Sequence, residues 1–180
     1  MARKTAEEPM PPVRDEAFWN EHYQNDQHRS APMVWSGKPH AHLIAETANL
    51  TPGSALDVGT GEGADAIWLA ERGWQVTAVD ISTVALERGR KQADDLGAAT
   101  AQRITWLHAD LTEWEPPVAS FDLVSAQFMH LPSVQRLPVY QRLAHSVAPG
   151  GVLLIVGHHP SDLETTARRL PNPDPLFTAD

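Results

Sequence analysis

The chain has 180 residues, enough for one compact domain with a sizeable core. Its 14 Lys and Arg stand against 23 Asp and Glu, a net charge of −9, so we expect neither a nucleic acid nor an anionic membrane as partner. Cysteine is absent, which excludes disulfides, thiolate nucleophiles and cysteine-based zinc sites. We see neither a signal peptide nor a run of roughly 20 apolar residues that would span a membrane, and therefore expect a cytoplasmic protein.

The N-terminal part reads as a helical cover rather than as part of a sheet. Residues 1–13 are rich in proline and form a mobile lead-in, whereas residues 14–24, RDEAFWNEHYQ, have the periodicity of a helix with an aromatic face. The aromatic residues at helical spacing are Phe18, Trp19, His22 and Tyr23. A loop over residues 30–38 precedes a second helical pattern over residues 39–49. We therefore assign residues 14–50 to an N-terminal helical cover.

After this cover, short apolar strands alternate with helical segments. The strands are SALDV, QVTAV, ITWL, FDLVS and VLLIV. Four of them are almost continuously apolar, which is typical of strands buried on both faces of a parallel sheet. The fold class is therefore α/β, a Rossmann-like doubly wound and mostly parallel sheet.

Local signals mark the helices between these strands. Ser82 is placed to cap a helix that ends before Gly97. A later helical segment, SVQRLPVYQRLAHSV, contains Pro138, so we expect a bend or a restart near Leu137. The residues Pro149, Gly150 and Gly151 should turn the chain into the last strand.

A glycine loop follows the first strand in LDVGTGEGADAIWLA. Gly59, Gly61 and Ala64 match the spacing G-x-G-x-x-A that holds a nucleotide-type ligand, and Asp80 ends the next strand, where an acid binds ribose hydroxyls. Enzymes that use dinucleotides and enzymes that use S-adenosylmethionine share this arrangement.

The charge of the loop separates these two ligands. The loop carries Asp57, Glu62 and Asp65, and residues 54–71 contain no Lys or Arg before the helix ends. A pyrophosphate is disfavoured there, whereas the sulfonium and ammonium groups of S-adenosylmethionine are favoured.

The glycine loop, together with HADLTEW, FDLVSAQFMHLP and APGGVLLIV, strongly resembles the class I S-adenosylmethionine-dependent methyltransferases over residues 50–156. FWNEHY and VWSGKP are similar to the N-terminal cover of the small thiopurine-type, halide/thiol-type and tellurite-resistance-type methyltransferases. The resemblance implies the strand order 3-2-1-4-5. It departs at Thr60, where many relatives have cysteine, and at the C-terminal end, where two strands of the family's hairpin are missing. We assign residues 51–180 to the methyltransferase domain, and leave open whether the chain is a truncated product.

The resemblance also implies a set of cofactor-binding residues. The loop glycines admit the methionine portion, Asp57 and Glu62 lie near its ammonium or hold the loop, and Asp80 takes both ribose hydroxyls. Asp110 accepts from the adenine amino group, with Ile81 on one face of the base. The full predicted set is Trp35, Lys38, Asp57, Gly59, Thr60, Gly61, Glu62, Asp80, Ile81, Ala109, Asp110, Leu111 and Gln127.

Each of these residues also has an alternative, purely structural role that involves no cofactor. The glycines serve a tight turn, Asp80 serves as a helix cap, and Asp110 serves as a turn former. Trp35 pins a loop to the core in that alternative, and Lys38 is simply solvated.

Two histidines are candidates for general base catalysis. His130 follows the fourth strand, and His158 follows the fifth, so both lie at the carboxyl edge where ligands bind in open α/β sheets. A histidine satisfied by backbone at a corner is the alternative for His130. His158 and His159 point to opposite sides of an extended chain, so they do not form a metal site, and we expect no metal.

These predictions combine into one reaction, the in-line transfer of a methyl group from S-adenosylmethionine to a small-molecule nucleophile, which leaves S-adenosylhomocysteine. Alignment of the reactants supplies most of the rate enhancement. We expect a soft acceptor: a thiol, a halide-like ion or a metalloid oxyanion. A soft anion needs no histidine, whereas a hydroxyl or an amine does. The alternatives are an NAD(P)-dependent oxidoreductase and a non-catalytic S-adenosylmethionine-binding fragment.

Overall fold

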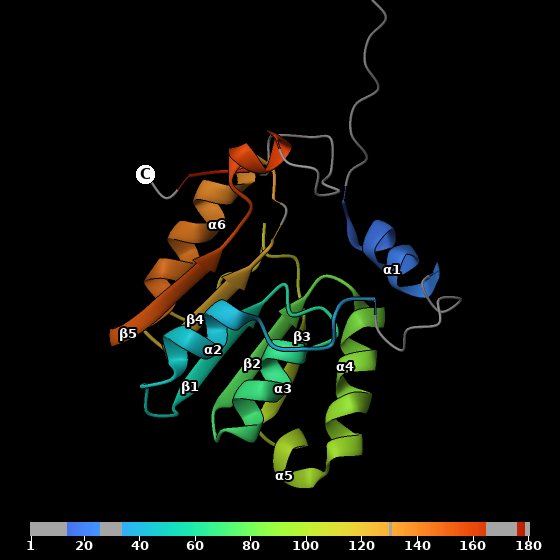
Figure 1. Cartoon of the computed structure of the whole chain (residues 1–180), viewed down its shortest axis with the longest axis vertical. Coiled ribbons are helices and arrows are strands. Elements are labelled where there is room, and N and C mark those ends of the chain that lie inside the picture. Colours follow the sequence, from blue (N-terminus) through green and yellow to red (C-terminus); the bar gives the residue numbers. More distant parts are fainter. Residues whose placement is uncertain (1–13, 26–33, 130, 165–175, 179–180) are drawn as a thin grey trace, which may run out of the picture.

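The structure is a computed structural model of the whole chain, and it describes residues 14–25, 34–129, 131–164 and 176–178. The predicted lead-in over residues 1–13 lies outside the described residues. A five-stranded parallel sheet forms the centre of the domain (Figure 1), with strand order β3-β2-β1-β4-β5. The predicted α/β class and strand order are therefore confirmed.

The strands coincide with the apolar runs of the sequence. They are β1 (Ser54–Val58), β2 (Gln75–Asp80), β3 (Ile104–His108), β4 (Phe121–Gln127) and β5 (Val147–Val156). Side chains alternate between the two faces, so β1 gives Ala55 to one core cluster and Leu56 to the other. Because both faces are buried, Ala55, Leu56 and Val58 of β1 are all apolar.

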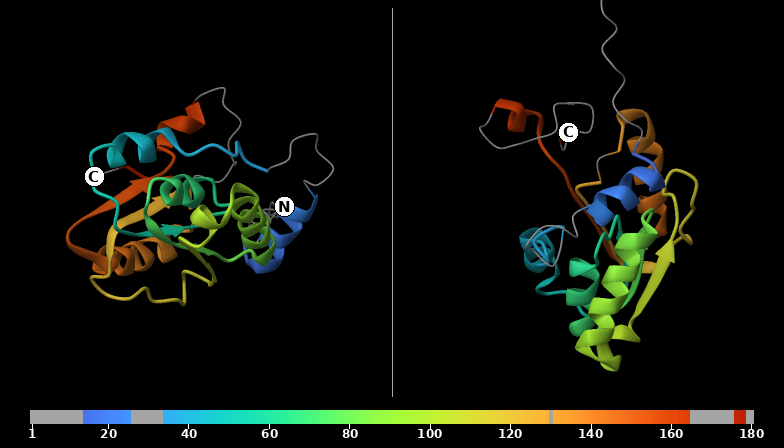
Figure 2. Two further views of the ribbon diagram at one scale, coloured as in Figure 1. Left: turned by 90° about the horizontal axis from the view of Figure 1, so that it is seen from below. Right: turned by 90° about the vertical axis from the view of Figure 1, so that its right-hand side faces the viewer.

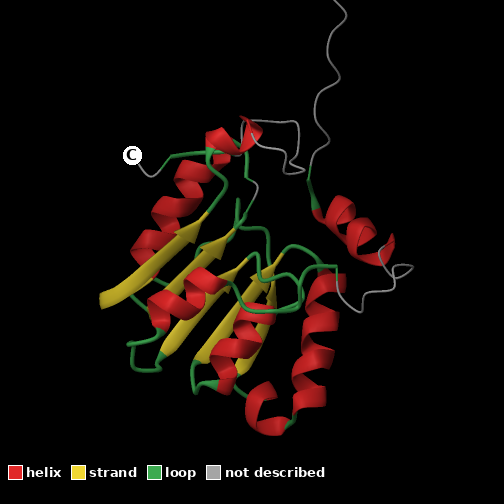
Figure 3. Cartoon of the chain, in the orientation of Figure 1, coloured by secondary structure: helices red, strands yellow, loops and turns green. Residues whose placement is uncertain are grey.

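Helices cover both faces of the sheet (Figures 2 and 3). On one face lie α2 (Ala41–Thr47), α3 (Ala64–Glu71) and α4 (Thr83–Leu96), whose Leu43, Leu69 and Ala93 enter the first core cluster. On the other face lies α6 (Ser133–Ser146), whose Val139 and Leu143 enter the second cluster. The helix α1 (Glu16–Asn25) packs beside α4 at the β3 side of the sheet.

The helix caps follow the sequence in α4 but not in α6. The Ser82 side chain accepts from Ala85 N and begins α4, and Gly97 ends it, as predicted. The short helix α5 (Ala98–Ala101) follows directly and was not predicted. Of the bend or restart expected near Leu137, the restart is wrong, because α6 is one helix that contains Pro138. Pro138 is the sixth residue of α6, so the ring removes a hydrogen bond only to the solvent-exposed first turn of the helix.

The turn expected at Pro149, Gly150 and Gly151 is also wrong, because these residues lie within β5. The register there changes from Phe121 paired with Val147 to Leu123 paired with Val152, so the segment between forms a bulge. Proline is tolerated at a bulge in an edge strand, because no ladder hydrogen bond is lost. The regular part of β5 is the predicted VLLIV run.

A 3₁₀ helix, η2 (Pro160–Glu164), follows β5. None of the helices in the described parts of the chain is long and apolar enough to cross a membrane.

Candidate functional site

The glycine loop connects β1 to α3 at the carboxyl edge of the sheet. Backbone hydrogen bonds hold the loop in place. Thr60 N donates to Val79 O of β2 at 3.0 Å, and Gly63 N donates to Thr60 O at 2.9 Å. Gly61 N donates to Asp80 Oδ2 at 2.8 Å, which joins the loop to the end of β2. These three backbone amides therefore all have acceptors inside the protein.

Two buried carboxylates and one half-buried carboxylate surround this loop. Asp57 is the next-to-last residue of β1 with 3% exposure, Asp80 ends β2 with 7% exposure, and the half-buried Asp65 lies in the first turn of α3. Burial, followed by the neighbouring charges of Asp65 and Asp80, raises the pKa of Asp57. Burial also raises the pKa of Asp65 and that of Asp80. None of the three forms an ion pair with a described Lys or Arg, so acidic groups are concentrated at this edge.

Glu62, the fourth acid of the loop, is paired instead. It is 2% exposed; its Oε1 lies 2.9 Å from Arg88 Nη1, and its Oε2 accepts from Val34 N at 2.9 Å. Arg88 also donates to the carbonyl oxygen of Tyr23 at 2.7 Å, near the end of α1. Glu62 and Arg88 thus tie the glycine loop to the N-terminal segments.

Two aromatic side chains lie over the glycine loop. Trp35 Nε1 donates to the hydroxyl of Tyr23 at 3.0 Å. A Cβ added to Gly61 would lie 2.9 Å from that hydroxyl oxygen, and Gly61 has a φ of +55°, so only glycine allows this close approach. Burial raises the pKa of Tyr23, which keeps the hydroxyl protonated. Tyr23 and Trp35 together form a roof over the glycine loop. The Tyr23 side chain is buried, whereas Trp35 is 53% exposed.

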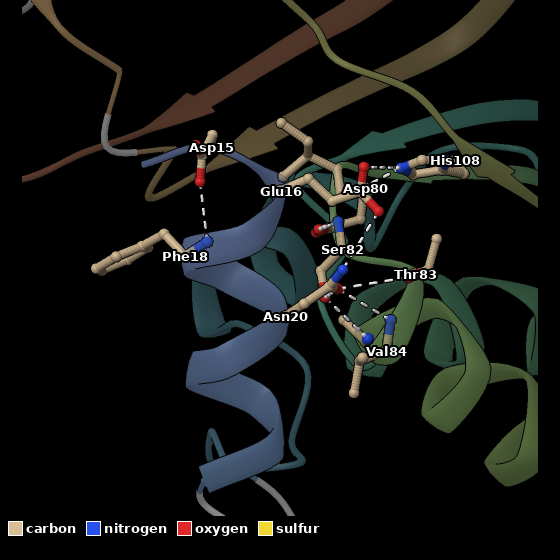
Figure 4. Close-up of polar contacts among 11 residues, drawn as sticks. Asp15, Glu16, Phe18, Asn20, Asp80, Ser82, Thr83, Val84 and His108 are labelled. Carbon is tan, nitrogen blue, oxygen red and sulfur yellow. Dashed lines mark hydrogen bonds and ion pairs between the residues drawn. The ribbon is translucent and has the colours of Figure 1, made fainter. Parts of the chain in front are cut away.

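The side chain of Asn20 ties α1 to the N-terminus of α4 (Figure 4). Asn20 Oδ1 accepts from Ser82 Oγ at 2.7 Å and from Val84 N at 3.3 Å. Ser82 N in turn donates to Asp80 Oδ1 at 2.8 Å. The predicted helical cover therefore contacts Ser82, which lies two residues after Asp80 and is hydrogen-bonded to it.

The loop after β3 carries the residues predicted to frame adenine. Ala109 N donates to Asp80 O at 3.1 Å, which brings this loop beside the end of β2. Asp110 Oδ1 accepts from both the backbone and the hydroxyl of Thr112, at 2.8 and 2.7 Å. Asp110 thus shapes a turn, and both of these bonds fall on a single carboxylate oxygen. Ile81 and Leu111 are partly buried on either side of this loop.

The end of β4 lies beside the glycine loop on the side away from β2. Gln127 Nε2 donates to Asp65 Oδ2 at 2.7 Å, and a Cβ added to Gly59 would lie 3.1 Å from Met129 Cγ. Phe128 has a φ of +51°, a strained conformation of the kind that clusters at functional sites. Its ring centroid lies 4.8 Å from that of His158.

His158 is half-buried at the end of β5. Its Nδ1 lies 3.1 Å from Asp162 Oδ2, and because a carboxylate only accepts, the neutral imidazole carries its proton on Nδ1. The Nε2 atom is then the acceptor. His159 is exposed and bonds Ser161 instead, so the two adjacent histidines do differ in surroundings. Among the described residues, no cluster of His, Cys, Asp or Glu could hold a metal ion.

Most of the predicted site residues gather at one edge of the sheet. Those on the glycine loop, at the ends of β2 and β4 and in the loop after β3 lie at the carboxyl edge of the sheet. Lys38 is exposed, and its backbone amide bonds Ser36. His130 lies outside the described residues and stays a sequence prediction.

Sequence reasoning missed four contributors to this edge. Tyr23 was seen only as part of an aromatic face, and Asp65 only as part of an acidic loop. Asn20 and Arg88 carry no local signal, because their partners lie 62 and 26 residues away in the chain.

The arrangement defines a Rossmann-like α/β domain whose ligand edge is acidic. Comparison with known proteins agrees. A family model described as a methyltransferase domain matches residues 55–151, more than half of the chain. The chain therefore belongs to the class I S-adenosylmethionine-dependent methyltransferases.

Individual relatives support the same assignment. The chain is 41% identical over 103 residues to the uncharacterized methyltransferase Rv0089 of Mycobacterium tuberculosis, covering 56% of this chain and 48% of that protein. It is 36% identical over 124 residues to the probable thiol methyltransferase 2 of Arabidopsis thaliana, covering 66% of this chain and 53% of the relative. The crystal structure of an S-adenosylmethionine-dependent methyltransferase from Mesorhizobium loti is 28% identical with a TM-score of 0.55, covering 66% of this chain and 53% of that one. The chain thus spans about half the length of the curated relatives it matches.

The residues at the edge fit the family's cofactor, S-adenosylmethionine. A cationic ligand suits an edge that carries the carboxylates of Asp57, Asp65 and Asp80, none of which has a described Lys or Arg in an ion pair. A pyrophosphate does not suit it, because the amides of Thr60, Gly61 and Gly63 already donate within the protein. The charge and the hydrogen bonds of the loop thus both oppose the alternative of an NAD(P)-dependent oxidoreductase.

Proposed function

We propose that this domain transfers a methyl group from S-adenosylmethionine to a small-molecule nucleophile, and that the acceptor is a soft one such as a thiol. The observation that carries the proposal is the set of three carboxylates around the glycine loop: the buried Asp57 and Asp80 and the half-buried Asp65. When bound, S-adenosylmethionine supplies a methyl group that is activated by a sulfonium centre.

The chain's own residues bind and orient this cofactor. Asp80 is the residue proposed for the ribose hydroxyls, since a carboxylate accepts several hydrogen bonds at once. Its two oxygens each accept one backbone amide, which fixes the carboxylate before a ligand arrives. Asp110 is proposed for the adenine amino group through the oxygen that does not accept from Thr112. Ile81, Ala109 and Leu111 supply the apolar frame of the base.

The N-terminal segments are proposed to exclude water from the reacting groups. Tyr23 and Trp35 lie over the glycine loop and are joined to each other by one hydrogen bond. The ion pair of Glu62 and Arg88 ties the segments that carry them to the loop. Since most of the rate enhancement is expected from alignment, the closure of this roof matters more than proton transfer. The assignment of residues 14–50 to a cover remains a proposal.

The acceptor side is aromatic and contains histidine. Phe128 lies between the rings of His40 and His158, at centroid distances of 5.1 and 4.8 Å. His158 is proposed to take the proton of an acceptor that arrives protonated, because Asp162 leaves Nε2 as the basic atom. The match to a probable thiol methyltransferase supports a thiol as acceptor. A thiol has a pKa near 8.5, so a base of this kind helps without being indispensable.

A panel assay that follows S-adenosylhomocysteine release tests the proposal. The panel contains small thiols, halide ions, phenols, amines, tRNA and a protein extract. We expect turnover with thiols, and a loss of rate in His158→Gln that becomes smaller as the pH rises toward the thiol pKa. His145→Gln, at an exposed histidine of α6, is the matched control. Turnover with tRNA or protein, and with none of the small molecules, would overturn the proposal.

A further inference from the structure

The aromatic ring of Phe177 packs against the end of β5, directly beside His158. Gly157, the residue before His158, has no side chain, and a Cβ added to it would overlap the tip of the Phe177 ring. Two residues of α6 contact the same ring. The Tyr140 ring meets it nearly edge-on at a centroid distance of 6.0 Å, and the guanidinium carbon of Arg136 lies 5.0 Å from its centroid. Phe177 is therefore held by both β5 and α6.

The backbone of Phe177 adds a hydrogen bond to this packing. Its N–H donates to the carbonyl oxygen of His158 at 3.2 Å. The ring contact lies on the amino side of the His158 Cα, at Gly157, and the hydrogen bond lies on the carbonyl side. One residue of the C-terminal segment thus restrains the main chain of His158 from both directions.

The position of this main chain decides what the imidazole of His158 reaches. The imidazole places Nδ1 3.1 Å from Asp162 Oδ2, and its centroid lies 4.8 Å from that of Phe128. Hydrogen bonds weaken steeply as their length and angle depart from the ideal, so a small shift of the backbone weakens the bond to Asp162. That bond is the one that puts the proton on Nδ1 and leaves Nε2 as the basic atom.

We propose that Phe177 is a positioning residue for His158, which keeps the imidazole bonded to Asp162 and in one tautomer. The use of Nε2 as a base rests on the proposed function, whereas the positioning is a property of the protein without any ligand. Phe177 itself does not touch the reacting atoms. A role in packing alone would change the stability of the protein and leave the tautomer of His158 as it is.

The tautomer of His158 is the direct readout. Long-range proton–nitrogen NMR spectra show which ring nitrogen carries the hydrogen, and the signals lost in His158→Gln assign the residue. At a pH of about 8.5 a histidine is mostly neutral. We expect the Nδ1–H form of the wild-type protein to exceed the Nε2–H form by more than about tenfold, because it alone bonds a carboxylate. In Phe177→Ala this ratio should fall to less than about threefold.

A second variant and a control complete the design. Gly157→Ala keeps Phe177 but displaces its ring, so it should also lower the ratio, and it decides the question if Phe177→Ala does not fold. Leu96→Ala, at an exposed leucine that ends α4, removes an apolar side chain elsewhere and should leave the ratio unchanged. A wild-type ratio near one, or a wild-type ratio retained in folded Phe177→Ala, would overturn the inference.

Turnover with β-mercaptoethanol tests whether the positioning serves methyl transfer. Phe177→Ala should lower kcat about threefold to tenfold and change the KM for S-adenosylmethionine by less than about twofold. In a His158→Gln background the same substitution should lower kcat by less than about twofold, because residues that act through one group are not additive. Equal losses in both backgrounds would overturn the link to catalysis. Absence of turnover with every thiol would instead overturn the proposed function, and the tautomer ratio would still decide whether Phe177 positions His158.

Discussion

Replacement of Asp57 by Asn should make the protein more stable and the ligand weaker. Asp57 is 3% exposed, and burial raises its pKa, with Asp65 and Asp80 adding to the effect. An acid whose pKa is raised in the folded state contributes stability below its unfolded pKa and loses it as the pH rises through the folded pKa. The ionised Asp57 therefore destabilises the folded protein at neutral pH, and Asp57→Asn removes this charge.

The size of the effect follows from two opposing contributions. At an effective dielectric constant of about 20, two unit charges repel by roughly 2 kcal/mol at a separation of about 8 Å, so the loss of one of three neighbouring carboxylates is favourable. The new amide group has hydrogens that need acceptors, which costs about 1 to 3 kcal/mol where they find none. Thr60 Oγ1, which donates to Asp57 Oδ2, keeps an oxygen acceptor in the variant. Because the carboxylates of Asp65 and Asp80 can accept from the amide, we expect a net gain of about 1 to 2 kcal/mol at pH 7.5.

Urea unfolding of the wild type and the variant at pH 7.5 and at pH 4 measures this gain. The gain should shrink at pH 4, where the wild-type carboxyl is largely protonated, and affinity for S-adenosylhomocysteine should fall in the variant at pH 7.5. Asp94→Asn, at an exposed acid of α4, is the matched control and should change stability by less than about 0.5 kcal/mol. A variant that is less stable than wild type at pH 7.5, or a gain that is equal at both pH values, would refute the electrostatic account of Asp57.

Three further substitutions test other parts of the structure. Asp80→Ala should weaken S-adenosylhomocysteine binding by about 2 to 4 kcal/mol, because two hydrogen bonds to a charged acceptor are lost; an unchanged affinity in calorimetry would remove Asp80 from the site. Gly89→Ala should lower the free energy of unfolding by roughly 1 to 3 kcal/mol, since the added Cβ would lie 2.6 Å from Trp106 and 2.9 Å from Glu62 O; the gain that alanine usually brings to a helix, seen in urea unfolding, would contradict the packing. Arg88→Met leaves Glu62 buried and unpaired, so hydrogen exchange in α1 should become faster; unchanged protection would show that this ion pair does not hold the cover.

The sheet was largely predictable from the sequence, because its strands are buried on both faces. Short apolar runs marked all five strands, and Ser82 with Gly97 marked the ends of α4. The errors concern two prolines that were expected to interrupt an element but lie at positions where the helix or strand tolerates them. Pro138 lies near the exposed start of α6, and Pro149 lies in a bulge of an edge strand, so neither proline ends an element.

The candidate site was predictable only in part. Residues next to the strand ends, such as Asp57 and Asp80, could be placed because parallel strands bring their carboxyl ends to one edge. Contacts between distant segments could not: the bond between Gln127 and Asp65 joins residues 62 positions apart, and neither has a local pattern that names the other. The pairing of Glu62 likewise depends on the packing of α4 against the loop.

The direct test of the central claim is equilibrium binding of S-adenosylmethionine, S-adenosylhomocysteine and NAD to one sample of the wild-type protein, measured by calorimetry at pH 7.5. The acidic edge of the sheet predicts that both sulfur-containing nucleosides bind. It predicts no binding of NAD, because the loop amides are engaged within the protein and the buried carboxylates repel a pyrophosphate. Binding of NAD with no binding of either nucleoside would contradict the account.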